Sequence, residues 1–134
     1  MSLISILVPA YNEEDNVRVC YERIAAVVDG LPGDEAEIIF TDNHSTDRTF
    51  AILSQIAAED PRVRVFRFSR NVGYQNSVMY AYKAARGDCA IQLDADLQDP
   101  PELIPQMLAL WRQGNQVVYG IRMKLPDGPV VTAL

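Results

Sequence analysis

Three carboxylates occur within six residues in the segment Asp94-Ala95-Asp96-Leu97-Gln98-Asp99. In an extended segment alternate side chains point the same way, so Asp94, Asp96 and Gln98 are predicted to share one side. Oxygen-bearing side chains in this arrangement suit a hard cation, Mg²⁺ or Mn²⁺, with diphosphate oxygens completing the octahedron. The alternative is a solvated acidic loop that caps the helix beginning at Pro100. We favour the metal site, because such a loop does not need carboxylates packed against their own repulsion.

A cation in this position has a definite chemical use. When a nucleoside diphosphate leaves, negative charge develops on its β-phosphate, and a metal that bridges both phosphates stabilises that charge. Arg122 and Lys124 come late in the chain and can add positive charge or bind an anionic acceptor. Both can also be ordinary surface cations, and for Lys124 that interpretation is the stronger one.

Two further polar segments follow predicted strands. In Pro9-Ala10-Tyr11-Asn12-Glu13-Glu14 the tyrosine can stack on a base and a carboxylate can accept a hydrogen bond from a ring N–H. Taken alone, this turn is more simply interpreted as a helix start, with Asn12 as the cap and the glutamates favouring the helix dipole. In Asp42-Asn43-His44-Ser45-Thr46-Asp47 the first aspartate is placed for base or ribose hydroxyls. His44 is the only histidine of the chain, so we interpret it as an exposed loop residue and not as a metal ligand.

Short apolar runs alternate with helical patterns along the chain, and these elements must position the polar segments. Strands are predicted at 4–8, 37–41, 63–68, 89–93 and 116–119, and helices from Val17 to Gly30, from Ser45 or Thr46 to Pro61, at 73–86, and from Pro100 to Gly114. This βα pattern, repeated four times and followed by a strand, predicts an α/β fold with a largely parallel sheet covered on both faces. Ligands bind at the carboxyl ends of strands in such sheets, and the polar segments lie there.

Composition and the absence of certain motifs argue against several functional classes of protein. The chain has 134 residues, 49% of them hydrophobic, which suits one compact domain. The net charge of -6 argues against nucleic-acid binding. No GxGxxG or GxxxxGK[ST] motif is present, which disfavours a dinucleotide-binding fold and a P-loop. Cys20 and Cys89 are interpreted as reduced core residues. No signal peptide and no apolar run of spanning length are seen, so a soluble, cytoplasmic domain is expected.

The motifs together resemble glycosyltransferase family two, and within it the polyprenyl-phosphate sugar transferases of the dolichyl-phosphate mannosyltransferase and bactoprenol glucosyltransferase type. The resemblance covers residues 4 to about 124. It is carried by Val8-Pro9-Ala10-Tyr11-Asn12-Glu13-Glu14, by Asp42 with Ser45, Asp47 and Thr49, by Arg70-Asn71-x-Gly73, by Ala85-Arg86-Gly87-Asp88, and by the segment from Asp94 to Glu102.

The resemblance implies a Rossmann-like GT-A fold, a UDP- or GDP-sugar donor, Mg²⁺ or Mn²⁺, and inverting transfer to a polyprenyl phosphate at the cytoplasmic face of the membrane. A phosphate nucleophile is ionised at neutral pH, so no strong general base is required. The residues implied at the nucleotide are Pro9, Ala10, Tyr11, Glu13, Asp42, Asp94 and Ala95; those implied at the metal are Asp94, Asp96 and Gln98; and those implied in catalysis are Asp96 and Arg122.

Departures from the family pattern limit these expectations. The usual Asp-Asp-Gly-Ser is Asp42-Asn43-His44-Ser45, and Tyr74-Gln75-Asn76 lies where relatives often carry a lysine and small residues. Relatives also continue well past this chain. We therefore expect a truncated GT-A domain over residues 1–124 and a short tail over 125–134, with little sugar transfer by the chain alone.

Two other functions remain as alternatives. The first is a nucleotide- and metal-binding module without turnover of its own. The second, a signalling receiver, is disfavoured because the turn at Tyr11 has no role in it. The sequence does not predict the sugar, the base or whether the protein forms an oligomer.

Overall fold

The computed structural model describes residues 1–121 and 130–133, which divide into two compact units, Met1–Pro101 and Glu102–Leu134. The elements of the first unit are β1 (Leu3–Ala10), α1 (Val17–Asp29), β2 (Glu35–Asp42), α2 (Thr49–Glu59), β3 (Val63–Arg67), α3 (Tyr74–Ala84) and β4 (Cys89–Gln92). A 3-10 turn, Pro101–Leu103, precedes α4 (Ile104–Arg112), β5 (Val118–Ile121) and β6 (Val130–Ala133). Among the described residues, no helix has the length and apolar character needed to cross a membrane.

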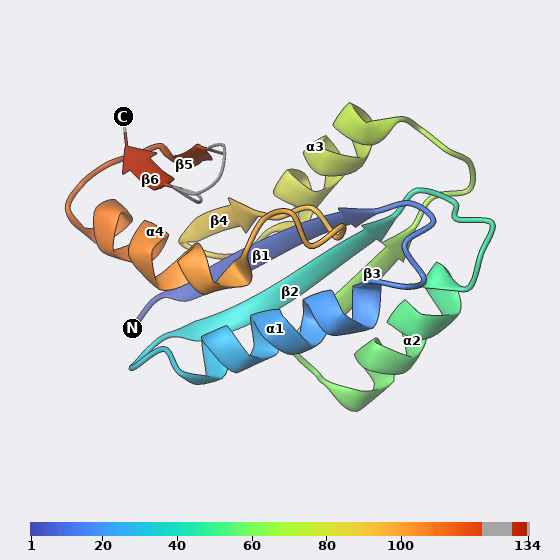
Figure 1. The fold of residues 1–134 in the computed structure, drawn as a ribbon, viewed down its shortest axis with the longest axis horizontal. Coiled ribbons are helices and arrows are strands. Elements are labelled where there is room, and N and C mark those ends of the chain that lie inside the picture. Colours follow the sequence, from blue (N-terminus) through green and yellow to red (C-terminus); the bar gives the residue numbers. More distant parts are fainter. Residues whose placement is uncertain (122–129, 134) are drawn as a thin grey trace. The chain divides into compact units, whose positions relative to one another are not determined.

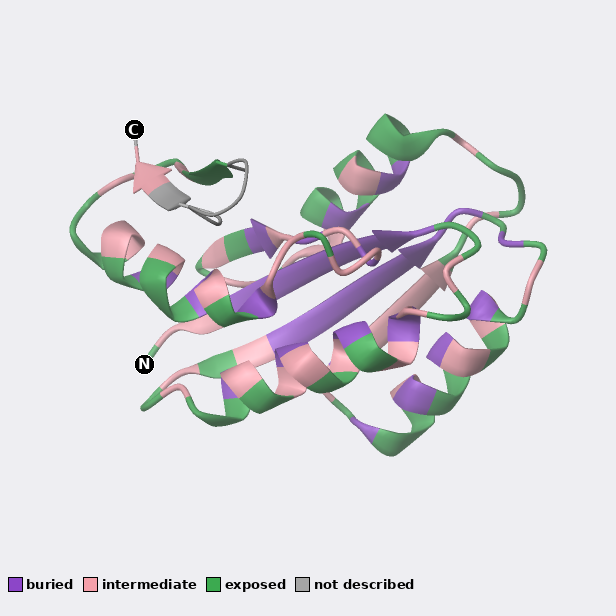
Figure 2. Cartoon of the chain, in the orientation of Figure 1, coloured by how far each residue is buried: buried purple, intermediate pink, exposed green. Residues whose placement is uncertain are grey.

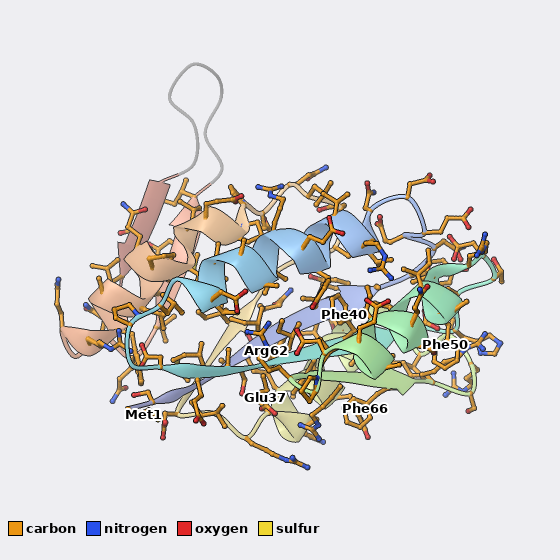
Figure 3. All side chains as sticks on the ribbon, turned by 90° about the horizontal axis from the view of Figure 1, so that it is seen from below. Met1, Glu37, Phe40, Phe50, Arg62 and Phe66 are labelled. Carbon is orange, nitrogen blue, oxygen red and sulfur yellow. The ribbon has the colours of Figure 1, made fainter. Side chains whose placement is uncertain are left out.

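The first unit is built on a parallel four-stranded sheet in the order β3-β2-β1-β4. Helices α1 and α2 cover one face of this sheet and α3 covers the other (Figures 1 and 3). The predicted α/β fold with a mostly parallel sheet is therefore confirmed for this unit. Because β1 and β4 are neighbours, the chain leaves β1 in one direction, through α1 to β2, and returns on the other side of β1.

The two central strands form the core of this unit. Seven of the eight residues of β1 and six of the eight residues of β2 are buried, seen in purple in Figure 2. A strand covered on both faces needs apolar side chains in both directions, which explains why the runs Ile4–Val8 and Ile38–Phe40 do not alternate with polar residues. On the α3 face, Leu7 and Ile39 pack with Ala81 of α3.

The fifth predicted strand differs from the expectation of one parallel sheet. It is observed at Val118–Ile121 and pairs antiparallel with β6 in a separate two-stranded sheet. Tyr119, Gly120 and Ile121 are exposed, whereas a strand inside a covered parallel sheet is buried. Strand β6 lies within residues 125–134, which were predicted as a tail, and the domain boundary at residue 124 stays a prediction.

The start of α2 also differs from its prediction. The helix begins at Thr49, and neither Ser45 nor Thr46 caps it. Instead, Asp47 Oδ1 accepts hydrogen bonds from the Thr49 N–H (2.9 Å) and from Thr49 Oγ1 (2.5 Å). Ser45 and Thr46 are unavailable as caps because they bond to the turn after β1, as described below.

A buried carboxylate accepts hydrogen bonds from several segments at the amino-terminal end of the sheet. Glu37 of β2 is 7% exposed, and its Oε1 accepts hydrogen bonds from Ser5 Oγ (2.7 Å) and from the Arg86 N–H (2.6 Å). Its Oε2 accepts one from Arg64 Nη1 (3.1 Å). The Gly87 N–H donates in turn to Ser5 Oγ (2.9 Å). The loop between α3 and β4 is thereby attached to β1 and β2.

Gly87 has no room for a side chain. A Cβ added there would lie 2.6 Å from Ser5 Oγ and 2.7 Å from the Leu3 carbonyl oxygen, which is backbone and cannot rotate away. Gly87→Ala is therefore expected to lower the free energy of unfolding by about 2 kcal/mol, measured by urea denaturation. Gly30→Ala is the matched control, because a Cβ at Gly30 would make ordinary contact, 3.5 Å from the Val27 carbonyl oxygen. Equal stability of the two variants would contradict the packing described for Gly87.

Candidate functional site

A pocket of about 360 Å³ opens where the carboxyl ends of β1 and β4 meet. At this place the order in which strands are added to the sheet reverses, since β2 and β3 lie on one side of β1 and β4 lies on the other. Open α/β sheets bind ligands at such a switch point. The lining comes from the ends of β1, β2 and β4, from the loop after β3 and from the start of α3. The lining residues are Pro9, Ala10, Tyr11, Glu13, Asn43, Asn71, Tyr74, Ser77, Asp94, Ala95 and Asp96.

Most of the predicted site residues are brought together here. Seven of them line the pocket: Pro9, Ala10, Tyr11, Glu13, Asp94, Ala95 and Asp96. Asp42 and Gln98 are not among the lining residues. Arg122, like Lys124, lies outside the described residues. The individual roles of all these residues in binding or catalysis stay predictions.

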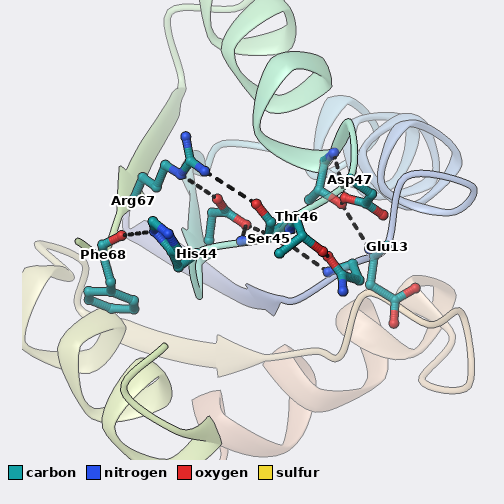
Figure 4. A network of polar contacts seen from close by, with 10 residues as sticks. Glu13, His44, Ser45, Thr46, Asp47, Arg67 and Phe68 are labelled. Atoms are coloured by element: carbon teal, nitrogen blue, oxygen red, sulfur yellow. Dashed lines mark hydrogen bonds and ion pairs between the residues drawn. The ribbon is translucent and has the colours of Figure 1, made fainter. Parts of the chain in front are cut away.

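The turn after β1 is held by the loop after β2 (Figure 4). The Asn12 N–H donates to Ser45 Oγ (2.9 Å) and the Glu13 N–H donates to Thr49 Oγ1 (2.8 Å). In return, Asn12 Oδ1 accepts a hydrogen bond from the Thr46 N–H (2.8 Å). Asn12 has a φ of 51°, a left-handed conformation that asparagine tolerates better than most residues. These bonds fix the backbone at Asn12 and Glu13. Tyr11 and Glu13, which line the pocket, are thereby positioned.

Asp42 has a structural position beneath this loop. It is fully buried, its Oδ1 accepts a hydrogen bond from Ser45 Oγ (2.5 Å), and Arg67 Nε lies 3.3 Å from its Oδ2. The Arg67 contact is an ion pair without hydrogen-bond geometry. His44, with a φ of 61°, is an exposed loop residue whose Nδ1 lies 3.1 Å from the Phe68 carbonyl oxygen. In this structure Asp42 therefore contacts the loop rather than the pocket.

Asp94 is held by two side chains at the wall of the pocket. Tyr74, the first residue of α3, donates its hydroxyl to Asp94 Oδ1 (2.7 Å), and Gln92 Nε2 lies 3.4 Å from the same oxygen. Gln92 Nε2 also donates to the Tyr74 hydroxyl (2.7 Å), and the Asp94 N–H donates to Asp99 Oδ2 (3.1 Å). Partial desolvation of its hydroxyl and the hydrogen bond to Asp94 raise the pKa of Tyr74 to about 12, so the hydroxyl stays protonated at neutral pH.

The segment that follows β4 is not extended, which corrects the argument from alternating side chains. The chain turns at Ala95 and Asp96, and Leu97 has a φ of 68°. The Gln98 N–H donates to Asp96 Oδ1 (3.1 Å), a local bond typical of aspartate in turns. Asp94 and Asp96 still both reach the pocket. Among the described residues, no group of three or more His, Cys, Asp or Glu side chains is arranged to hold a metal by itself.

Four lining residues were not predicted as site residues: Asn43, Asn71, Tyr74 and Ser77. Asn43 and Tyr74 belong to the segments that depart from the family pattern, and this was a signal that could have identified them. Asn43 Oδ1 accepts a hydrogen bond from the Val72 N–H (2.8 Å). Ser77 Oγ lies 2.9 Å from Thr41 Oγ1, and both residues are buried, so this pair is recognised only once α3 is placed on the sheet.

Comparison with known proteins is decisive at this point. The pattern of Glycosyl transferase family 2 matches residues 5–133. The chain belongs to glycosyl transferase family 2. The predicted family resemblance is confirmed, and this domain is a glycosyltransferase domain.

Two relatives of this chain have names that describe glycosyltransferases. The chain is 42% identical over 120 residues to the "Uncharacterized glycosyltransferase YkcC" of Bacillus subtilis, a match that covers 90% of this chain and 37% of the relative. It is 37% identical over 129 residues to an undecaprenyl-phosphate 4-deoxy-4-formamido-L-arabinose transferase of Edwardsiella ictaluri, covering 95% of this chain and 39% of the relative. The chain thus spans less than two fifths of the length of either relative.

Solved structures agree with the predicted GT-A fold. Glucosyl-3-phosphoglycerate synthase from Mycobacterium tuberculosis, solved with Mn²⁺, UDP and glucosyl-3-phosphoglycerate, matches with a TM-score of 0.64 and 28% identity, covering 82% of this chain and 39% of the synthase. The GT-A fold is therefore confirmed.

Proposed function

We propose that this domain binds a UDP- or GDP-sugar together with Mg²⁺ or Mn²⁺ and takes part in inverting transfer of the sugar to a polyprenyl phosphate at the cytoplasmic face of the membrane. One observation carries the metal dependence. Glu13, Asp94 and Asp96 line the pocket, and no lysine, arginine or histidine is among its described lining residues. A diphosphate entering this pocket therefore meets carboxylates and needs positive charge from elsewhere.

The size of the repulsion supports a cation. Two like charges about 4 Å apart repel by roughly 4 kcal/mol at an effective dielectric constant of about 20. A divalent cation held by Asp94 and Asp96 would change this repulsion into attraction. The donor set fits the ion, because carboxylate oxygens are the ligands that Mg²⁺ and Mn²⁺ prefer. Phosphate oxygens and water would complete the coordination, since the protein offers no complete set of its own.

The residues of this chain would then have separate tasks. Asp94 and Asp96 would hold the cation, which would supply positive charge to the leaving diphosphate, and Gln98 is a third candidate ligand. Tyr11 is 46% exposed at the pocket and offers its ring to the base. Glu13 is placed to accept a hydrogen bond from a ring N–H or a hydroxyl.

The acceptor is proposed from the relatives and from chemistry. An undecaprenyl-phosphate transferase is among the related proteins. A phosphate acceptor is already ionised at neutral pH, so it attacks the anomeric carbon without a strong general base. The lining residues that the structure describes include no histidine, which agrees with such a nucleophile. A single in-line displacement gives inversion.

Calorimetric titration tests the donor and metal parts of this proposal. UDP, UDP-glucose, GDP and GDP-mannose are titrated into the purified chain in Mn²⁺ and, separately, in excess EDTA. One of the two nucleotide series is expected to bind at least tenfold more tightly in Mn²⁺, because the acidic pocket repels an unaccompanied diphosphate. Equal affinity with Mn²⁺ and with EDTA would overturn the metal-dependent proposal.

A further inference from the structure

The hydroxyl of Tyr74 makes a directed contact whose purpose the proposed function does not explain. It lies 2.7 Å from Asp94 Oδ1 and 2.7 Å from Gln92 Nε2. An ionised carboxylate can only accept hydrogen bonds, and an amide NH₂ can only donate. The Tyr74 oxygen therefore accepts from Gln92 and its proton points at Asp94. The hydrogen bonds therefore run from Gln92 to the Tyr74 hydroxyl and from that hydroxyl to Asp94 Oδ1.

The backbone that precedes Tyr74 is fixed by two asparagine side chains. Asn43 Oδ1 accepts from the Val72 N–H (2.8 Å), and Asn71 Oδ1 accepts from the Gly73 N–H (2.9 Å). Gly73 has a φ of 85°, a conformation that L side chains rarely adopt, and α3 begins at the next residue. The loop after β3 is thereby attached to the end of β2, and the first side chain of α3 crosses to the segment after β4.

We propose that Tyr74 is a positioning residue that orients the carboxylate of Asp94 toward the cation and thereby sets the affinity of the pocket for the metal–nucleotide complex. The inference rests on the proposed function and adds a residue to it. A carboxylate fixed by a neutral donor has lost its rotational freedom before the ligand arrives, so less entropy is lost on binding. The donor also lowers the repulsion between Asp94 and the nearby carboxylates.

Tyr74→Phe removes the hydroxyl and keeps the ring, so contacts made by the ring persist. The affinity for Mn²⁺ in the presence of saturating UDP or GDP, whichever the wild type binds, is expected to fall three- to tenfold. It is measured from the free Mn²⁺ signal in electron paramagnetic resonance. Tyr82→Phe is the matched control, because Tyr82 lies on the same helix, is 45% exposed, and is expected to leave Mn²⁺ affinity unchanged.

A double-mutant cycle with Asp94→Asn separates positioning from a merely structural role. If Tyr74 acts through Asp94, Tyr74→Phe has little further effect in the Asp94→Asn background, whereas independent effects would multiply. Multiplying effects, or a Tyr74→Phe affinity equal to that of the wild type, would overturn the role of Tyr74 alone. A wild type that binds nucleotide equally in Mn²⁺ and EDTA would instead overturn the proposed function on which this inference rests.

Discussion

Replacing Glu37 with alanine is expected to lower the free energy of unfolding by about 3 kcal/mol, because it removes the acceptor of three hydrogen bonds at once. Ser5 is fully buried and the Arg86 N–H donates to the same oxygen, Oε1. Without the carboxylate, the buried Ser5 hydroxyl and the partly buried Arg86 N–H both lose their acceptor. The Arg64 guanidinium, whose side chain is 25% exposed, would lose its ion pair as well.

The same carboxylate makes the stability depend on pH. Burial raises the pKa of Glu37, but the hydrogen bonds from the Arg86 N–H, Ser5 and Arg64 outweigh burial and hold this pKa below its ordinary value. A pKa that is lower in the folded chain than in the unfolded chain gives stability that is complete above the unfolded value, about 4.3, and is lost as the pH falls through the folded value. The stability difference between wild type and Glu37→Ala should therefore shrink in acid.

Chemical denaturation at pH 7 and at pH 3 measures both effects. Glu35→Ala is the matched control, because Glu35 is an exposed glutamate on the same strand and its removal should change stability by less than about 0.5 kcal/mol. A Glu37→Ala variant as stable as Glu35→Ala at pH 7 would mean that the buried bonds contribute nothing net. A difference that stayed constant down to pH 3 would contradict the lowered pKa.

The elements of the first unit were predictable because their apolar patterns are strong. Ile4–Val8 carries one polar residue, Ser5, and Ile38–Phe40 carries none, a pattern typical of a strand buried on both faces. The fifth strand was misplaced for the same reason, since a short run such as Val117–Tyr119 has the same composition whether it joins a parallel sheet or an antiparallel pair. The partner strand of β5 decides between these sheets, and local sequence does not encode it.

The candidate site was predictable where chemistry is local and not where it depends on contacts between distant segments. The turn at Tyr11 and the carboxylates at Asp94 and Asp96 were found because each follows a recognisable strand. Asp42 also follows a strand, yet its carboxylate contacts Ser45 and Arg67 and is fully buried. Its orientation depends on an arginine 25 positions away in the sequence, and no local pattern reports that. The contact of Tyr74 with Asp94 was invisible for the same reason.

Asp96→Asn is expected to weaken metal-supported nucleotide binding by roughly 30-fold, about 2 kcal/mol. The substitution removes one of the three carboxylate charges that line the pocket while nearly preserving the shape of the side chain. An amide oxygen is a weaker ligand for a hard cation than a carboxylate oxygen, because it carries only a partial charge. Titration of the variant with UDP or GDP in Mn²⁺ measures the loss, and binding in EDTA should not weaken, since less negative charge then repels the diphosphate.

The fold of this variant should be nearly unaffected, which makes the result interpretable. The Asp96 contact that bears on local structure is the acceptance of the Gln98 N–H by Oδ1 at 3.1 Å, and the oxygen of asparagine can accept the same bond. The melting temperature should therefore stay close to that of the wild type. Asp15→Asn is the matched control, because Asp15 is exposed beside the same turn as Glu13 and does not line the pocket. If Asp96→Asn and Asp15→Asn bound the nucleotide equally in Mn²⁺, Asp96 would be an ordinary turn residue. The cation would then have to be held at Asp94 without it.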